Sequence, residues 1–116
     1  MYLDEIREYC LSKQETTEGL PFDEETLVFK VVGKIFLLTN ISNFSSMNLK
    51  CEPEYALQLR EHYSEIQPGY HMNKKMWNTV SLKGNLTRDF ILSLVDHSYQ
   101  EVVKGLKKAD RERLLQ

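Results

Sequence analysis

One segment, residues 68–80, has the highest density of side chains in this sequence that could bind a ligand. Lysines, side-chain amides, a histidine, a tyrosine and the sole tryptophan gather there without one acidic residue. Lysines bind phosphates, amides hydrogen-bond to phosphates or base edges, and aromatic rings stack on unpaired bases. We therefore predict that this segment forms a site for nucleic acid or another anion. The site also includes two cationic residues that follow the segment, Lys83 and Arg88. The predicted site residues are Tyr70, His71, Asn73, Lys74, Lys75, Trp77, Asn78, Lys83 and Arg88.

Each of these residues also has a structural interpretation. A lone tryptophan in a small domain usually packs in or beside the core, as Tyr70 also could, and a histidine such as His71 usually makes a structural hydrogen bond. Asn73 would stabilise a turn through bonds between its side chain and the backbone. Lys74 and Lys75 are solvated at such a turn unless an anion binds. The sequence leaves these alternatives open.

Charge is unevenly distributed along the 116 residues, whose net charge is −2. Residues 1–25 carry eight acidic and two basic residues, whereas residues 68–88 carry four basic residues and no acid. This pattern predicts a polarised molecule, and we expect the four cations to form one surface with the segment. Four phosphate contacts would give weak, strongly salt-dependent binding. The basic run is also compatible with an ordinary solvated hairpin.

The sequence offers little support for enzymatic chemistry. Its three histidines, His62, His71 and His97, have no metal-ligand spacing with another His, Cys or acid. Glycine-rich phosphate loops and nucleophile elbows are absent. We therefore predict a non-enzymatic protein with no catalytic residue, metal or cofactor. The acidic residues near the N-terminus offer a remote metal-binding alternative, but such spacing is more typical of a solvated helix face.

Length and composition indicate one globular domain, residues 1–116. No apolar run approaches the roughly 20 residues of a membrane helix, and the first residues are acidic where a signal peptide is basic. We therefore expect a cytoplasmic protein that makes no membrane contact, and we expect a monomer. Cys10 and Cys51 lack a CxxC pattern and are expected to be reduced core residues.

Hydrophobic periodicity predicts three helices and five strands. Apolar residues three and four positions apart predict helices over residues 2–12, from Pro53 to before Pro68, and from an N-cap at Thr87 onward. Alternation predicts strands over residues 26–32, 35–39, 47–51, 70–72 and 77–82. The order α-β-β-β-α-β-β-α describes an α+β domain with helices packed on an antiparallel sheet. Residues 109–116 are expected to fray.

Several motifs occur in a recognisable order along the chain. They are Pro21–Phe22 with Thr26–Val31 and Gly33–Lys34, Lys50–Glu54, Pro68–Lys74 with Trp77–Val80, and Asp96–Tyr99. Over almost the whole chain they resemble the MmcQ/YjbR family, most specifically between Gly69 and Val80. The resemblance implies a bacterial cytoplasmic protein with a fold similar to CyaY, the bacterial frataxin, and to the double-wing DNA-binding domain of a phage transcription factor. By that fold analogy it implies DNA binding, with a regulatory role as one form of it.

A second class of function would use the same surface. A groove beside the hairpin of residues 70–78 would hold an anionic small molecule or the carboxylates of a partner protein. DNA binding predicts an affinity at low salt that is lost when Lys74 and Lys75 become Glu. The alternative predicts a pocket lined by His71, Asn73 and Trp77.

Overall fold

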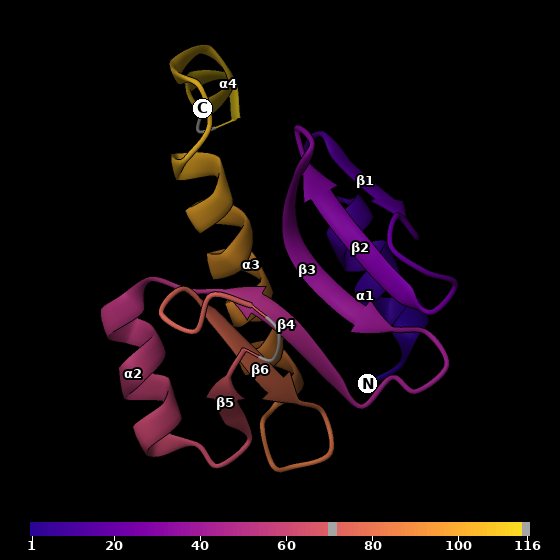
Figure 1. Ribbon diagram of the computed structural model, residues 1–116, viewed down its shortest axis with the longest axis vertical. Coiled ribbons are helices and arrows are strands. Elements are labelled where there is room, and N and C mark those ends of the chain that lie inside the picture. The colour runs from indigo at the N-terminus through magenta and orange to yellow at the C-terminus, as the bar shows by residue number, and fades with distance from the viewer. Residues whose placement is uncertain (70–71, 115–116) are drawn as a thin grey trace.

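The computed structural model describes residues 1–69 and 72–114, which form an α+β domain with an open antiparallel sheet (Figure 1). The described helices are α1 (Leu3–Leu11), α2 (Pro53–His62), α3 (Arg88–Lys104) and α4 (Lys108–Leu114). The described strands are β1 (Thr16–Gly19), β2 (Thr26–Val31), β3 (Lys34–Asn40), β4 (Ser46–Lys50), β5 (Ile66–Pro68) and β6 (Trp77–Ser81). Their order in the sheet is β1-β2-β3-β4-β6-β5, with every neighbouring pair antiparallel. The predicted fold class is confirmed.

The core lies between the sheet and the helices α1 and α3, which stand behind the sheet in Figure 1. Alternation in β2 sends Leu27 and Phe29 into it, as the sequence predicts. In β3 two consecutive residues, Phe36 and Leu37, are both fully buried. The pairing register shifts opposite them, and such a bulge lets neighbouring side chains point to the same side. The cysteines are free and buried, as expected.

The opposite side of the sheet, which we call the outer face, carries a row of residues aligned by the strand register. The row runs through Val28, Leu38, Asn48 and Thr79. Two positions further along β4 and β6, Lys50 and Trp77 are direct cross-strand partners, so their side chains also belong to the outer face.

Two strands and one helix were not predicted correctly. The strand β1 is polar and short, but it is an edge strand whose stability comes from its backbone ladder with β2. The first strand of the predicted hairpin was placed at residues 70–72, whereas β5, at Ile66–Pro68, is the strand that pairs with β6. Proline is tolerated there because β5 is the other edge of the sheet. Residues 70 and 71 lie outside the described part of the chain.

The C-terminal residues up to 114 form α4 where fraying was expected. Arg113 explains the difference, because its guanidinium bonds to both Glu15 carboxylate oxygens at 2.7 and 2.9 Å and to Asp110 at 2.8 Å. Leu114 also packs against the core. A contact with a residue 98 positions away decides the structure of this segment, and local sequence does not report it.

Candidate nucleic-acid interface

Arg60 of α2 holds in place the loop between β5 and β6, of which residue 69 and residues 72–76 are described. Its Nε donates to Asn78 Oδ1 at 2.6 Å, and its Nη2 donates to the Trp77 carbonyl at 3.2 Å and to the Lys74 carbonyl. Gly69 closes the loop by donating its N–H to the Trp77 carbonyl at 2.8 Å. A Cβ on Gly69 would lie 2.8 Å from the Trp77 Cβ, so only glycine fits. The described contacts of Arg60 and Gly69 with this segment therefore go mainly to its backbone carbonyl groups.

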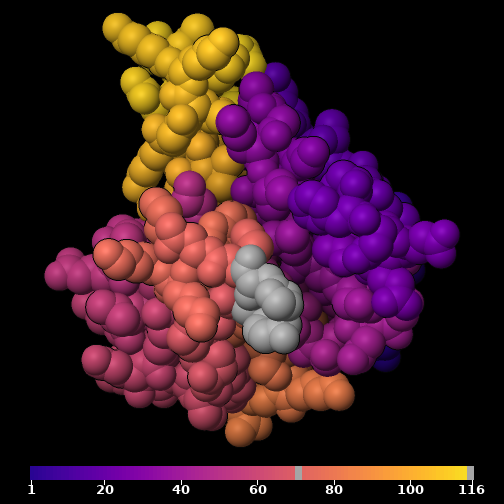
Figure 2. Space-filling view, in the orientation of Figure 1, coloured from indigo at the N-terminus to yellow at the C-terminus, as the bar shows by residue number. Residues whose placement is uncertain are grey.

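Lys74 and Lys75 project from this loop and are exposed. Within residues 1–69 and 72–114, neither lysine pairs with an acid. The Cys51 N–H donates to the Met76 carbonyl at 2.8 Å, which holds the loop beside the end of β4. In Figure 2 the loop lies over the front of the molecule, next to α2, whereas α1 stands behind the sheet in Figure 1. The acidic side chains of α1 therefore do not neutralise these lysines.

The other residues predicted within the loop have mixed outcomes. Asn73 serves turn geometry, because its Oδ1 accepts the Lys75 N–H at 3.0 Å. Asn78 is only 2% exposed and points to the core, so the prediction that it contacts a ligand is wrong. One residue earlier, Trp77 is partly buried and lines a pocket between β3, β4 and the end of α3. Tyr70 and His71 lie outside the described residues.

Lys83 and Arg88 do not share a surface with the loop lysines, which corrects the expectation of one four-cation surface. Lys83 follows the far end of β6, a five-residue strand that spans roughly 15 Å, whereas Lys74 and Lys75 precede its near end. Arg88 begins α3, and its Nε lies 2.8 Å from Glu5 Oε2 in α1. That ion pair lies on the helix side of the sheet and neutralises the arginine.

Two lysines that sequence reasoning did not select lie beside Trp77. Lys34, at the start of β3, and Lys50, at the end of β4, line the same pocket of about 400 Å³ as the indole. Neither lysine has an ion-pair partner in the described part of the chain. Alternation with buried Met47 and Leu49 could have placed Lys50 on the outer face. The sequence could not predict that Lys34 lines the same pocket as Lys50, because this depends on how β3 and β4 diverge.

We call Lys34, Lys50, Lys74 and Lys75 the basic end. The bond between Cys51 and Met76 joins the end of β4 to the loop, so both lysine pairs flank the start of β6. A second pocket, of about 370 Å³, lies on the α2 side and is lined by Pro53, Leu57, Arg60, Lys74 and Lys75. The basic end thus has two pockets, of which Trp77 lines one, and four lysines that form no ion pair within residues 1–69 and 72–114.

The Asp96–Tyr99 motif on α3 has a purely internal role. Ser98 is fully buried; its Oγ accepts the Lys50 N–H at 2.8 Å and donates to the Phe36 carbonyl at 2.5 Å. His97 Nε2 accepts the Glu52 N–H at 3.1 Å. Burial lowers the pKa of His97 below its ordinary value, which keeps the ring neutral and able to accept. These two residues join α3 to the end of β4.

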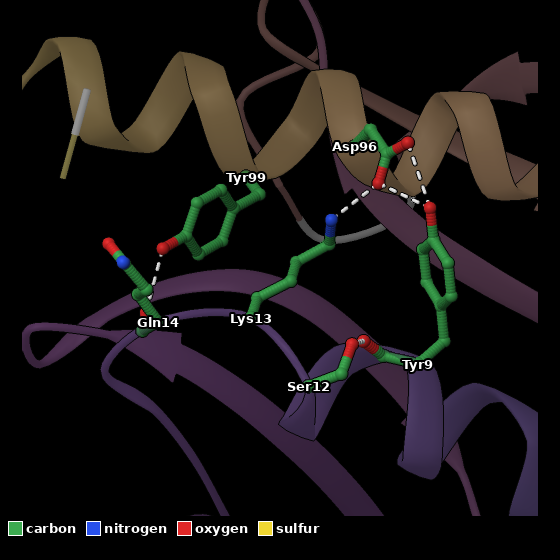
Figure 3. Close-up of polar contacts among 6 residues, drawn as sticks. All are labelled: Tyr9, Ser12, Lys13, Gln14, Asp96 and Tyr99. Atoms are coloured by element: carbon green, nitrogen blue, oxygen red, sulfur yellow. Dashed lines mark hydrogen bonds and ion pairs between the residues drawn. The ribbon is translucent and has the colours of Figure 1, made fainter. Parts of the chain in front are cut away.

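The remaining residues of the motif join α3 to the N-terminal segment (Figure 3). Both Asp96 oxygens accept from the Tyr9 hydroxyl, at 2.7 and 2.8 Å, and Lys13 Nζ also bonds to Asp96. The Tyr99 hydroxyl donates to the Gln14 carbonyl at 2.7 Å. Burial, followed by the hydrogen bond to Asp96, raises the pKa of Tyr9 to about 12. Every side chain of the motif therefore has a partner within the fold.

Residues 1–69 and 72–114 contain no group of three or more His, Cys, Asp or Glu side chains arranged to hold a metal ion. The helices of the same residues also lack the combination of length and apolar character needed to cross a bilayer. Burial raises the pKa values of the Cys10 and Cys51 thiols to about 12, so neither is an activated nucleophile.

Comparison with known proteins adds the family. The YjbR family model matches residues 11–101. An Escherichia coli K12 protein named uncharacterized protein YjbR is 34% identical over 117 residues, covering 100% of this chain and 99% of its own. Uncharacterized protein YbdF of Escherichia coli O157:H7 is 39% identical over 95 residues, covering 81% of this chain and 78% of its own.

A solved structure of similar shape agrees with these sequence relatives. The crystal structure of Deinococcus radiodurans protein DR2400, with a DUF419 domain, superposes with a TM-score of 0.88 at 40% identity over 97% of this chain and 86% of that one. A Pseudomonas syringae crystal structure gives a TM-score of 0.72 at 29% identity, covering 87% of this chain and 98% of that one. Motifs, fold and relatives agree, and the chain belongs to the YjbR family.

Proposed function

We propose that this protein is a non-enzymatic module that binds DNA, weakly and with strong salt dependence, through the basic end. The observation that carries the proposal is the arrangement of Lys34, Lys50, Lys74 and Lys75 around Trp77, with no acid paired to any of them among the described residues. Phosphate contacts of this number give a modest, sequence-independent affinity. The proposal places the protein in the bacterial cytoplasm and treats it as a monomer.

The local charge supports this proposal in spite of the net charge of −2. Several acids elsewhere are already paired within the fold, such as Glu5 with Arg88 and Glu18 with Arg7. Within the described residues the lysines of the basic end form no ion pair, so their desolvation at a phosphate would break none of the ion pairs described. Positive side chains gathered at one end of a molecule also steer a polyanion toward that end.

Fluorescence anisotropy of a labelled oligonucleotide at low salt tests the proposal. Binding should weaken with a log–log salt slope of about −3.6 on duplex DNA, which is −0.9 for each of four phosphates. Lys75→Glu should weaken binding several-fold. Lys83→Glu is the matched control, because it makes the same charge change on an exposed lysine at the far end of β6 and should have less than half that effect. Equal effects of the two variants, or no binding near 20 mM salt, would overturn the proposal.

An acidic protein segment is the second candidate partner, and one observation favours it. Leu57 is 57% exposed in the pocket that it shares with Lys74 and Lys75. A segment with a large apolar side chain between two carboxylates matches such a pocket. Titration with a glutamate-rich peptide that contains one leucine tests this. Leu57→Asp should abolish peptide binding while it reduces DNA affinity only slightly, and an unchanged peptide affinity would exclude this partner.

A further inference from the structure

The strands β3 and β4 separate at the basic end. The two strands pair over three residue pairs, and the last pair on this side is Leu37 with Leu49. Lys50, the next residue of β4, has no partner in β3. Instead, the Lys50 N–H bonds to Ser98 Oγ at 2.8 Å, and the same hydroxyl donates to the Phe36 carbonyl. A side chain from α3 thus takes the place of a direct bond between the strands. In Figure 1 the start of β3 and the end of β4 diverge, with α3 behind them.

The pocket of about 400 Å³ occupies this divergence. Lys34 stands on the β3 side, Lys50 and Trp77 stand on the β4 and β6 side, and Val102 and Gly105 of the α3 end form the floor. The pocket therefore combines two cations, one aromatic surface and a largely apolar floor. A patch of solvated lysines alone would not have this floor or this aromatic wall.

These groups match the parts of a nucleotide. Two unpaired ammonium groups attract a phosphate, and the face of an indole stacks on a base of any identity. The volume falls within the range of small-ligand sites, which are about 300–1,000 Å³. A base within a duplex is stacked and paired, so it cannot enter such a pocket unless it first leaves the helix.

We infer that the divergence between β3 and β4 is a subsite for one unpaired nucleotide, with the base against Trp77 and the phosphate between Lys34 and Lys50. The inference rests on the proposed function and deepens it, since it makes single-stranded nucleic acid the preferred ligand over duplex. The loop that carries Lys74 and Lys75 ends at Trp77, so these lysines meet the phosphates that precede or follow the bound nucleotide. The same chemistry would also hold a free mononucleotide.

The intrinsic fluorescence of Trp77 tests the inference, because it is the only tryptophan in the chain. The wild-type protein is titrated with single-stranded oligothymidylate, with a duplex of the same length and with thymidine monophosphate, at low salt. The single strand should quench Trp77 and bind at least fivefold more tightly than the duplex. Quenching by the mononucleotide at comparable concentration also supports the subsite and identifies the free nucleotide as its ligand. Duplex and single strand binding equally without quenching would overturn the inference but leave the proposed function standing. Absence of binding by any of the three would overturn both.

Two variants separate charge from shape in this subsite. Lys34→Glu should remove the quenching and the preference for single strands, whereas Lys83→Glu should leave both. Gly105→Leu retains every charge and adds a side chain at the floor, where a Cβ meets nothing closer than the Val102 carbonyl at 3.5 Å. It should lower affinity for single strands at least threefold without changing affinity for duplex. An equal loss for both ligands, or no loss, would count against a built subsite.

Discussion

The Asp96–Tyr99 motif and the loop before β6 are both dense in polar side chains, and both belong to the motifs that carry the family resemblance. They use those side chains in opposite ways. Each side chain of the Asp96–Tyr99 motif has a partner within the fold: Ser98 and His97 hold the end of β4, while Asp96 and Tyr99 hold the N-terminal segment. In the loop the backbone is held by Arg60, and the lysine side chains remain without an acidic partner among the described residues.

This difference separates structural polar residues from candidates for binding. A buried hydrogen bond contributes to stability because leaving its partner unsatisfied is costly, whereas an unpaired exposed cation contributes almost nothing to stability. Substitutions on α3 should therefore change stability first, and substitutions of the loop lysines should change ligand affinity first. The four predictions below test this contrast.

Replacement of Ser98 should have the largest effect on stability. Ser98→Ala leaves the Lys50 N–H and the Phe36 carbonyl without partners at the strand divergence. The expected loss is about 2 to 4 kcal/mol in the free energy of unfolding, measured by urea denaturation. Ser93→Ala is the control on the same helix, because Ser93 is exposed and should change stability by less than about 0.5 kcal/mol. Equal losses would refute the bridging role.

A substitution of Arg60 should affect both stability and ligand affinity, because Arg60 is a structural residue that also positions the loop. Arg60→Leu should cost about 2 kcal/mol, because it removes charged hydrogen bonds to Asn78 and to the Trp77 carbonyl. It should also weaken oligonucleotide binding although all four lysines of the basic end remain. Calorimetry and anisotropy on the same sample measure both effects. An oligonucleotide affinity unchanged from wild type would mean that the position of the loop does not matter for binding.

The lowered pKa of His97 predicts that the stability of the fold depends on pH. Its pKa is lowered by burial, so below about pH 6.5 the unfolded chain takes up a proton that the folded chain does not. The contribution of His97 to the free energy of unfolding should therefore be constant above that pH. Below that pH, the free energy of unfolding should fall as the pH drops. His97→Gln, which can still accept the Glu52 N–H, should make denaturation curves at pH 7.5 and pH 5 differ less than in wild type. If the difference between the two pH values were the same in the variant and in wild type, His97 would not be the cause of the pH dependence.

Arg88 should give the smallest effect. Its ion pair with Glu5 is largely exposed, so Arg88→Ala should cost less than about 1 kcal/mol in thermal or urea unfolding. Oligonucleotide affinity should stay within about twofold of wild type, because the residue lies on the helix side of the sheet. A loss of affinity as large as that of Lys75→Glu would support the single four-cation surface that the structure contradicts.

Residues in the loop illustrate how far sequence reasoning reaches. The sequence predicts a turn role for Asn73 as one alternative, and the bond from the Lys75 N–H to its side chain agrees with that role. Asn78 is predicted as a site residue, although alternation in β6 puts it on the same face as Val80, which is buried. The register with β4 and the guanidinium of Arg60 send it inward, and both are long-range contacts.

Local pattern determined the α+β class, the helices α1, α2 and α3, and the strands from β2 to β4, because apolar periodicity and capping residues act over a few positions. Tertiary structure alone decided that β5 pairs at Ile66–Pro68, that α4 docks through Arg113, and that Arg88 meets Glu5. It also decided that Lys34 and Lys50 line one pocket with Trp77. These outcomes depend on contacts between segments that are far apart in the sequence, and the spacing of residues along the chain does not determine those contacts.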